Sequence, residues 1–159
     1  MNVTIRFATR QDVPVILDFI KELAAYEKLM HEVVATEALL EKYLFDEQKA
    51  EVIFGEVNGK PIAFALFFTN FSTFLGKPGL YLEDLYVQKE YRGQGIGKQI
   101  LAFLANLALE RDYGRLEWWV LDWNTNSIAF YKQLGALPMD EWTTFRVTEE
   151  KLHLIANAK

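Results

Sequence analysis

The sequence predicts an α/β fold with a mixed sheet, in which antiparallel strands come first and a parallel crossover comes later. Two observations lead to this prediction. Short strand-like runs alternate with amphipathic helical patterns, and the Asn58-Gly59 pair between two such runs is a strong hairpin signal. Further on, a glycine-rich segment joins an apolar run ending at Val87 to a helical pattern.

The first half of the chain predicts two helices and three strands. Thr9 followed by Asp12 resembles a capping box, and the apolar residues after it lie on one helical face. Thr36 is a suitable N-cap for a second, short helix. The expected elements are a strand at 3–7, a helix from 9 to 24, a helix from 36 to 45, and strands at 51–57 and 62–71.

The second half continues the alternation without a linker or a repeat, so the chain is expected to form a single domain over residues 1–159. Gly135 is placed where a helix would end in a left-handed residue. The expected elements are a strand at 80–87, a helix at 95–111, a strand at 116–121, a helix at 124–134, a strand at 142–147 and a final helix from 148.

Composition narrows the class of protein. The 159 residues are 51% hydrophobic, which is enough for a sizeable core, and the net charge of −5 argues against a general nucleic-acid binder. An acidic protein can still attract cationic small molecules. The chain has no cysteine and only two histidines, His31 and His153, so no metal site is expected.

The chain shows no sign of a membrane or secreted protein. Residues 1–12 lack the apolar region of a signal peptide, and the longest apolar run, residues 62–68, is far shorter than a membrane span. We therefore expect a cytoplasmic protein with no membrane partner.

The segment from Tyr91 to Lys98 is the most informative motif. Its three glycines allow the backbone to approach a ligand, and the amides of the following helix start suit a pyrophosphate. A Walker A loop would need glycine at Arg92, and a dinucleotide loop would need glycine at Lys98. The pattern that fits is Arg-x-x-Gly-x-Gly, from Arg92 through Gly97. The alternative is a glycine-rich turn that only caps a helix.

This loop resembles the coenzyme-A pyrophosphate loop of the GNAT acetyltransferase superfamily. Residues 24–29, 81–87, 120–124 and 131–136 are further similar to one branch, the spermidine/spermine and thialysine N-acetyltransferases. The resemblance implies a GNAT-like, mostly antiparallel twisted sheet with helices on both faces and acetyl-CoA in the splay between two central strands. It also implies a homodimer formed through C-terminal strands. Residues 142–147 are compatible with that pairing, or with an ordinary core.

The resemblance implies roles for two side chains in acetyl transfer. An alkyl amine with a pKa of ~10.4 is mostly protonated at pH 7, so a group must accept its proton. The resemblance implies that Glu83 accepts this proton through water, or else only pairs with a cationic substrate. Tyr131 is implied to protonate the coenzyme-A thiolate; on its own, it would be taken for a helix tyrosine that packs its ring.

The remaining site residues also come from the resemblance. Backbone amides of Leu85, Tyr86 and Val87 are implied to hold the pantetheine arm. Asn124 and Ser127 match cofactor-contacting positions, although both also suit helix capping. The pyrophosphate would be bound by Arg92, Gly93, Gln94, Gly95, Ile96, Gly97 and Lys98.

Acidic and aromatic residues match the acceptor pocket of these enzymes. The acids would favour a dication, and an aromatic ring can face an ammonium group. The segment from 135 to 142 is shorter than in the polyamine enzymes, and the local sequence resembles the thialysine branch more. The expected acceptor-site residues are Tyr26, Glu27, Glu83 and Asp84, completed by Asp140, Glu141 and Trp142. The alternative for Glu27, Asp140 and Glu141 is solvated surface charge.

The sequence thus predicts an acetyl-CoA-dependent N-acetyltransferase that acts by direct transfer on a small primary amine, of the diamine, polyamine or thialysine kind. Two alternatives stay open: an acetyltransferase for peptide or protein amines, and a non-catalytic acyl-CoA-binding module. The presence of both Tyr131 and Glu83 favours an enzyme.

Overall fold

The computed structural model describes residues 1–158, and its centre is a five-stranded sheet in the order β1-β2-β3-β4-β5. Neighbouring strands from β1 to β4 are antiparallel, and β5 is parallel to β4. The predicted mixed, mostly antiparallel sheet is therefore confirmed. Its strands are β1 (Thr4–Phe7), β2 (Glu51–Val57), β3 (Lys60–Ser72), β4 (Lys77–Val87) and β5 (Leu116–Trp118).

The helices fall close to their predicted positions. They are α1 (Val13–Tyr26), α2 (Glu37–Leu40), α3 (Ile96–Glu110), α4 (Thr125–Gln133) and α5 (Glu149–Ala156). Shorter turns are the 3-10 helices η1 (Arg10–Asp12), η2 (Met30–Glu32) and η4 (Lys89–Tyr91), and the π-helix η3 (Glu41–Asp46).

The chain separates into two compact units, Met1–Trp119 and Val120–Lys159. The first unit contains the sheet with α1, α2 and α3, and the second contains α4 and α5. The expectation of a single domain over residues 1–159 stays a prediction.

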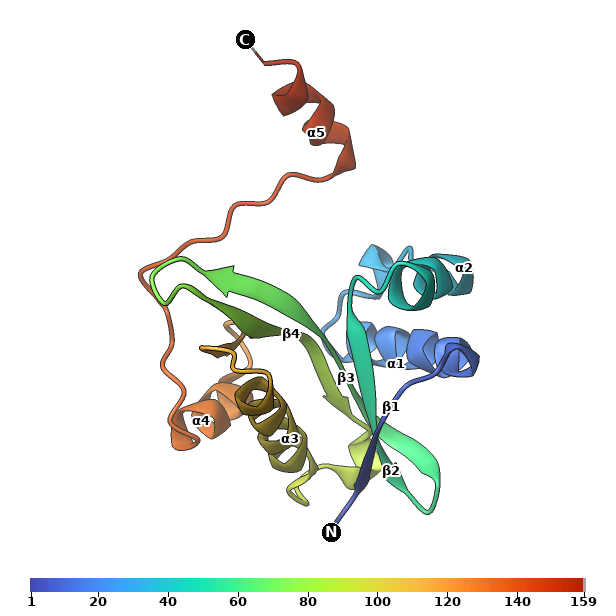
Figure 1. The fold of residues 1–159 in the computed structure, drawn as a ribbon. Helices are drawn as coiled ribbons and strands as arrows, with labels where there is room; N and C mark the ends of the chain where they lie inside the picture. The colour runs from blue at the N-terminus through green and yellow to red at the C-terminus, as the bar shows by residue number, and fades with distance from the viewer. Residues whose placement is uncertain (159) are drawn as a thin grey trace. The chain divides into compact units, whose positions relative to one another are not determined.

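In the first unit, helices cover both faces of the sheet, as predicted (Figure 1). On one face, the ring of Phe19 from α1 stacks on Phe64 of β3 at 5.2 Å between centroids. On the other face, a Cβ added to Gly55 would lie 3.7 Å from Ile100 Cδ1 of α3. Gly55 follows Phe54, and neighbouring strand residues point to opposite faces, so α1 and α3 pack on opposite sides.

The start of α1 is fixed by the predicted capping box. The Thr9 amide donates to Asp12 Oδ2 at 2.7 Å, and Arg6 of β1 donates to both carboxylate oxygens of Asp12 at 2.8 and 3.0 Å. The hydrogen bonds from Arg6 lower the pKa of Asp12 to about 2. The box opens the three-residue turn η1, and α1 begins directly after this turn, at Val13.

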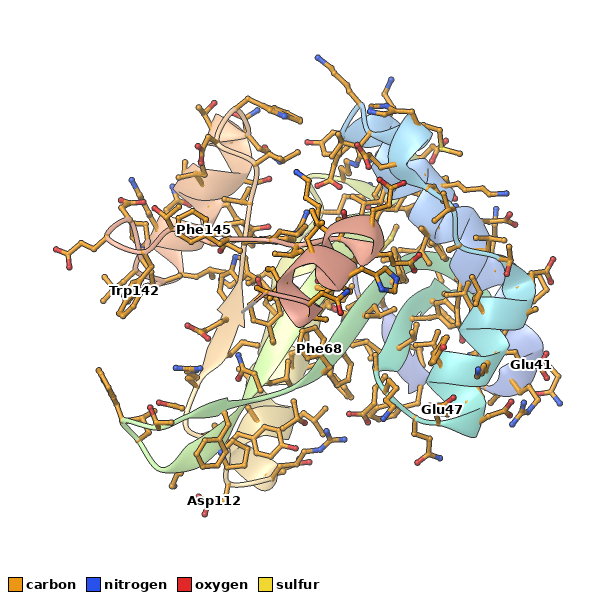
Figure 2. All side chains as sticks on the ribbon, turned by 90° about the horizontal axis from the view of Figure 1, so that it is seen from above. Glu41, Glu47, Phe68, Asp112, Trp142 and Phe145 are labelled. Atoms are coloured by element: carbon orange, nitrogen blue, oxygen red, sulfur yellow. The ribbon has the colours of Figure 1, made fainter. Side chains whose placement is uncertain are left out.

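The predicted second helix changes type along its length. The Thr36 hydroxyl accepts from the Leu39 amide at 3.2 Å, which confirms the cap. After Leu40 the chain widens into η3; Figure 2 labels its first residue, Glu41, and the residue that follows it, Glu47. The wider turn lets Leu40 and Phe45, five residues apart, both pack against the core over α1.

Residues 142–147 do not form the predicted strand. They pair with no strand in the described part of the chain, and Trp142 and Phe145, labelled in Figure 2, are 72% and 93% exposed. A strand needs a neighbour to satisfy its amides and carbonyls, so a β-prone sequence without one remains irregular.

Candidate active site

The centre of the site is a β-bulge in β4. Leu66 of β3 pairs with Asp84 and Phe67 pairs with Leu82, so Glu83 is the extra residue between them. The extra residue changes which face the following side chains occupy. Asp84 therefore lies opposite Leu66, on the sheet face covered by α1.

Beyond this bulge, one edge of β4 is open. The parallel pairing with β5 ends at Leu82 and Trp118, whereas β3 continues to pair with Leu85, Tyr86 and Val87. Among the described residues, this stretch of β4 has a strand on one side only. An open edge of this kind can take an extended ligand as an added strand.

The glycine-rich loop lies directly after β4 and leads into α3. Gly93 and Gly95 have φ of 75° and 81°, and Gly95 is the N-cap of α3 without any side-chain cap. Within the described chain, no protein group accepts a hydrogen bond from the amides of Gly93 through Lys98. These donors stand at the positive end of the helix dipole, which favours an anion.

Space around the loop also fits a ligand. A Cβ added to Gly93, Gly95 or Gly97 would meet no heavy atom within 4 Å. The glycines are therefore not required by packing inside the protein. Gly93 and Gly95 are explained by their positive φ, whereas Gly97 lies within α3 and has no such explanation.

The side chain of Arg92 contacts the protein rather than only bordering the loop. Its Nε donates to the Val87 carbonyl at 2.8 Å. Its guanidinium carbon lies 4.7 Å from the ring centroid of Tyr26 and 5.2 Å from that of Tyr86. Both distances suit a cation–π contact.

An acidic cavity of about 360 Å³ lies between the end of α1, the following segment and β4. Two of the predicted acceptor residues, Glu27 and Asp84, line it together. A third carboxylate, Glu32, is not predicted, because it lies in η2, a single 3-10 turn too short to show hydrophobic periodicity. The other lining residues are apolar: Ile20, Leu23, Ala24, Leu29, Val33, Val34 and Ala35.

The carboxylates of this cavity influence one another. Burial, followed by repulsion from Glu83 and Glu27, raises the pKa of Asp84 to about 7. Burial also raises the pKa of Glu27. Glu83 thus acts on Asp84 from the bulge, and the cavity carries a negative charge that a cation would relieve.

The predicted residues of the second unit lie at the N-cap of α4, on α4 and after it. Asn124 accepts from the Ser127 amide at 3.3 Å, so it caps α4. Tyr131 lies on α4 with its ring 5.6 Å from that of Phe130. Asp140, Glu141 and Trp142 are exposed in the irregular segment that follows. Their roles toward acceptor or cofactor stay predictions.

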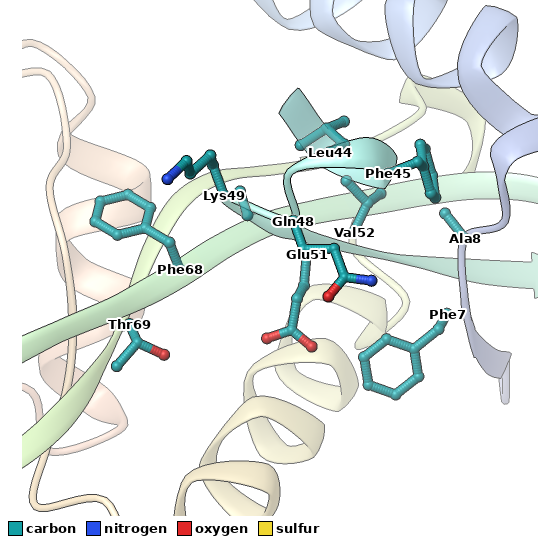
Figure 3. Close-up of a pocket in the computed structure, with 11 residues that line it drawn as sticks. Phe7, Ala8, Leu44, Phe45, Gln48, Lys49, Glu51, Val52, Phe68 and Thr69 are labelled. Atoms are coloured by element: carbon teal, nitrogen blue, oxygen red, sulfur yellow. The ribbon is translucent and has the colours of Figure 1, made fainter. Parts of the chain in front are cut away.

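A second cavity, of about 490 Å³, contains none of the predicted site residues (Figure 3). Phe7, Phe45 and Phe68 give it apolar walls. Its carboxylate, Glu51, already accepts hydrogen bonds from the two terminal guanidinium nitrogens of Arg111, at 2.7 and 2.9 Å. The acidic cavity is therefore the better candidate for a cationic ligand.

Residues 17–136 of this chain match the acetyltransferase (GNAT) family. A thialysine N-epsilon-acetyltransferase from Bos taurus is 39% identical over 97% of both chains. The L-ornithine N5-acetyltransferase NATA1 from Arabidopsis thaliana is 33% identical over 95% of this chain and 86% of its own length. An integron cassette protein from the mobile metagenome of V. cholerae has the same fold, with a TM-score of 0.81, 27% identity and 99% coverage of both chains.

The chain thus belongs to the GNAT acetyltransferase family. Within this family it belongs to the branch of the spermidine/spermine and thialysine N-acetyltransferases, as the sequence predicts. It is an N-acetyltransferase. Enzymes of this family use acetyl-CoA as the acyl donor. In the described residues, no helix is both long and apolar enough to cross a membrane.

Proposed function

We propose that this enzyme transfers an acetyl group from acetyl-CoA to a small primary amine that carries a second positive charge. The main support for this proposal is the acidic cavity, where Glu27, Glu32 and Asp84 are the charged residues of an otherwise apolar lining. Carboxylates suit the charged ends of such an amine and the aliphatic wall suits its methylene chain. The cavity volume of about 360 Å³ lies in the range of small-molecule sites.

The relatives support an acceptor of this size. Their names give thialysine and L-ornithine, which are small amino acids with a side-chain amine. Both carry the reacting amine together with another amino group and a carboxylate. A diamine or polyamine presents the same pair of cationic groups without the carboxylate, so the three classes need to be compared directly.

The loop fits the acyl donor. Amides without an acceptor from Gly93 through Lys98, and open space over Gly97, suit a pyrophosphate that approaches the backbone. The open edge at Leu85, Tyr86 and Val87 suits the pantetheine arm, with Asn124 and Ser127 as further contacts. When bound, acetyl-CoA would supply the acetyl group as a thioester.

Two side chains would handle the protons. Glu83, the bulged residue beside Asp84, would take the proton that the ammonium group must lose before nitrogen can attack. The Tyr131 hydroxyl would donate a proton to the departing sulfur. A phenol of pKa ~10 is a weaker acid than a thiol of pKa ~8.5, so this transfer is uphill by roughly 2 kcal/mol. It therefore requires the hydroxyl to be held against the sulfur as the carbon–sulfur bond breaks. The amine nitrogen would form its bond to the acetyl carbon as the carbon–sulfur bond of the thioester breaks, so the acetyl group passes directly to the amine. The acylated nitrogen would lose its second proton to solvent, Tyr131 would regain a proton from solvent and Glu83 would release its own, so that one net proton is released in each turnover.

We also propose that the enzyme is a homodimer in the cytoplasm. The support comes from residues 142–147, which have a β-prone sequence and no strand partner in the described chain. Trp142 and Phe145 expose large apolar surfaces there, and a second copy could cover them.

The decisive experiment is an acetylation assay that detects the released thiol. The panel holds thialysine, L-ornithine, diamines, polyamines, lysine and a peptide with a free N-terminus. We expect the highest kcat/KM with a small acceptor that carries two amines. A preference for the peptide over every small amine would instead identify a protein acetyltransferase.

A further inference from the structure

Arg92 lies between the two halves of the proposed site. It is the first residue of the motif that leads into the glycine-rich loop, and its side chain turns back toward α1 and β4. Nε donates to the Val87 carbonyl at 2.8 Å, which fixes the guanidinium plane. The rings of Tyr26 and Tyr86 then flank the guanidinium, at 4.7 and 5.2 Å from its carbon.

Both rings are close in the chain to a carboxylate of the acidic cavity. Tyr26 ends α1, and the next residue, Glu27, lines the cavity. Tyr86 follows Asp84 by two residues on the same strand, so both side chains point to the face covered by α1. The guanidinium therefore touches the two elements that form the cavity wall.

We infer that Arg92 is a positioning residue that joins the wall of the acceptor cavity to the pyrophosphate loop, so that Tyr26 contributes to acetyl-CoA binding without touching it. This inference rests on the proposed function. The loop from Gly93 to Lys98 leaves β4 with no side-chain cap on α3, and Arg92 is its anchor to α1.

Arg92 as an anchor differs from Arg92 as a simple phosphate ligand. A ligand acts through its own charge, so the loss of a distant ring would not change acetyl-CoA affinity. An anchor depends on its partner, because the guanidinium loses its cation–π contact when the Tyr26 ring is removed. The two roles therefore differ in how Arg92 and Tyr26 depend on each other.

A double-mutant cycle on the acetyl-CoA Kd tests this dependence by calorimetry. Arg92→Gln and Tyr26→Leu should each weaken binding by about tenfold, or ~1.4 kcal/mol. The double variant should be no weaker than the weaker single variant. Tyr26→Phe keeps the ring, so Arg92→Gln should weaken acetyl-CoA binding in that background as much as it does in the wild-type protein.

Lys98→Gln is the matched control, because it removes a positive charge from the same loop. Combined with Tyr26→Leu, its effect should be additive. Additive effects of Arg92→Gln and Tyr26→Leu, or unchanged affinity in Tyr26→Leu, would overturn the anchor and leave the proposed function intact. A wild-type protein that binds no acetyl-CoA would overturn the proposed function and this inference together.

Discussion

Asp84 is a carboxylate whose environment opposes its own charge. It is partly buried at the cavity, next to Glu83 and close to Glu27, and its pKa is raised to about 7. An unfolded chain would return this pKa to ~3.9. The folded protein therefore binds the proton more tightly, and folding stability falls as pH rises from ~4 to ~7. The site keeps this arrangement at a cost to stability.

Replacing Asp84 with Asn should remove that cost. Between pH 5 and pH 8, urea unfolding should show a smaller loss of stability in Asp84→Asn than in the wild type, by on the order of 1–3 kcal/mol. Asp18→Asn, at an exposed position of α1, is the control and should follow the wild type. Parallel pH profiles for wild type and Asp84→Asn would contradict the prediction.

Asp84 should also couple the binding of the amine acceptor to the release of protons. A bound dication favours ionised Asp84, so binding at pH 7 should release protons. Calorimetry of amine binding in two buffers of different ionisation enthalpy measures this release. We expect a clear difference between the buffers for the wild type and a smaller one for Asp84→Asn.

Tyr131 offers the sharpest test of the chemistry. Tyr131→Phe removes one hydroxyl and keeps the ring beside Phe130. Turnover should fall by roughly 10²–10⁴, the usual size of a general acid effect, with little change in acetyl-CoA affinity. Tyr43→Phe, on an exposed side chain of η3, should keep full turnover. Near wild-type turnover in Tyr131→Phe, when chemistry limits the rate, would leave only a packing role.

At the scale of elements, the sequence predicts the structures that neighbouring residues encode, but it does not predict where one extra residue interrupts a strand or a helix. The Asn58-Gly59 hairpin and the amphipathic pattern of α3 are encoded by neighbouring residues, and both were predicted. The bulge at Glu83 and the π-turn at Glu41–Asp46 each add a residue to a regular pattern, and no residue type marks them. Residues 142–147 carry a strand composition, but a strand also needs a partner.

The sequence predicts the strand that carries Glu83 and Asp84 and the glycine-rich segment after it, and the structure has both in this order. The sequence could not show that Glu27 and Asp84 line one cavity, or that Glu32 joins them, because this depends on how α1 packs on the sheet. The contact of Arg92 with Tyr26 spans distant parts of the chain, so no local pattern encodes it.

The loop between β4 and α3 can be tested against a matched turn. Gly95 and Gly59 have φ of 81° and 75°, and a Cβ at either position would meet nothing within 4 Å. Gly95→Val and Gly59→Val should therefore cost similar stability, roughly 1–2 kcal/mol. Only Gly95→Val should weaken acetyl-CoA binding in calorimetry. Unchanged affinity in Gly95→Val would reject this loop as the pyrophosphate site.

At the scale of the whole molecule, the proposed dimer concerns the exposed apolar residues near the C-terminus. Phe145 and Phe74 are 93% and 94% exposed, but Phe74 lies in the turn between β3 and β4. Light scattering should give twice the 18.4 kDa chain mass for the wild type and for Phe74→Asp, and a lower mass for Phe145→Asp. A wild-type mass of one chain at micromolar concentration would refute the dimer.

The uncapped start of α3 should set the rate at which its backbone amides exchange hydrogen with solvent. The amides from Gly93 to Lys98 have no acceptor within the described chain, so in heavy water they should take up deuterium almost as fast as an unfolded peptide. A pyrophosphate seated on them would slow that uptake. The same few amides would then report occupancy of the loop in real time, whichever amine the enzyme acetylates and even in variants that no longer turn over.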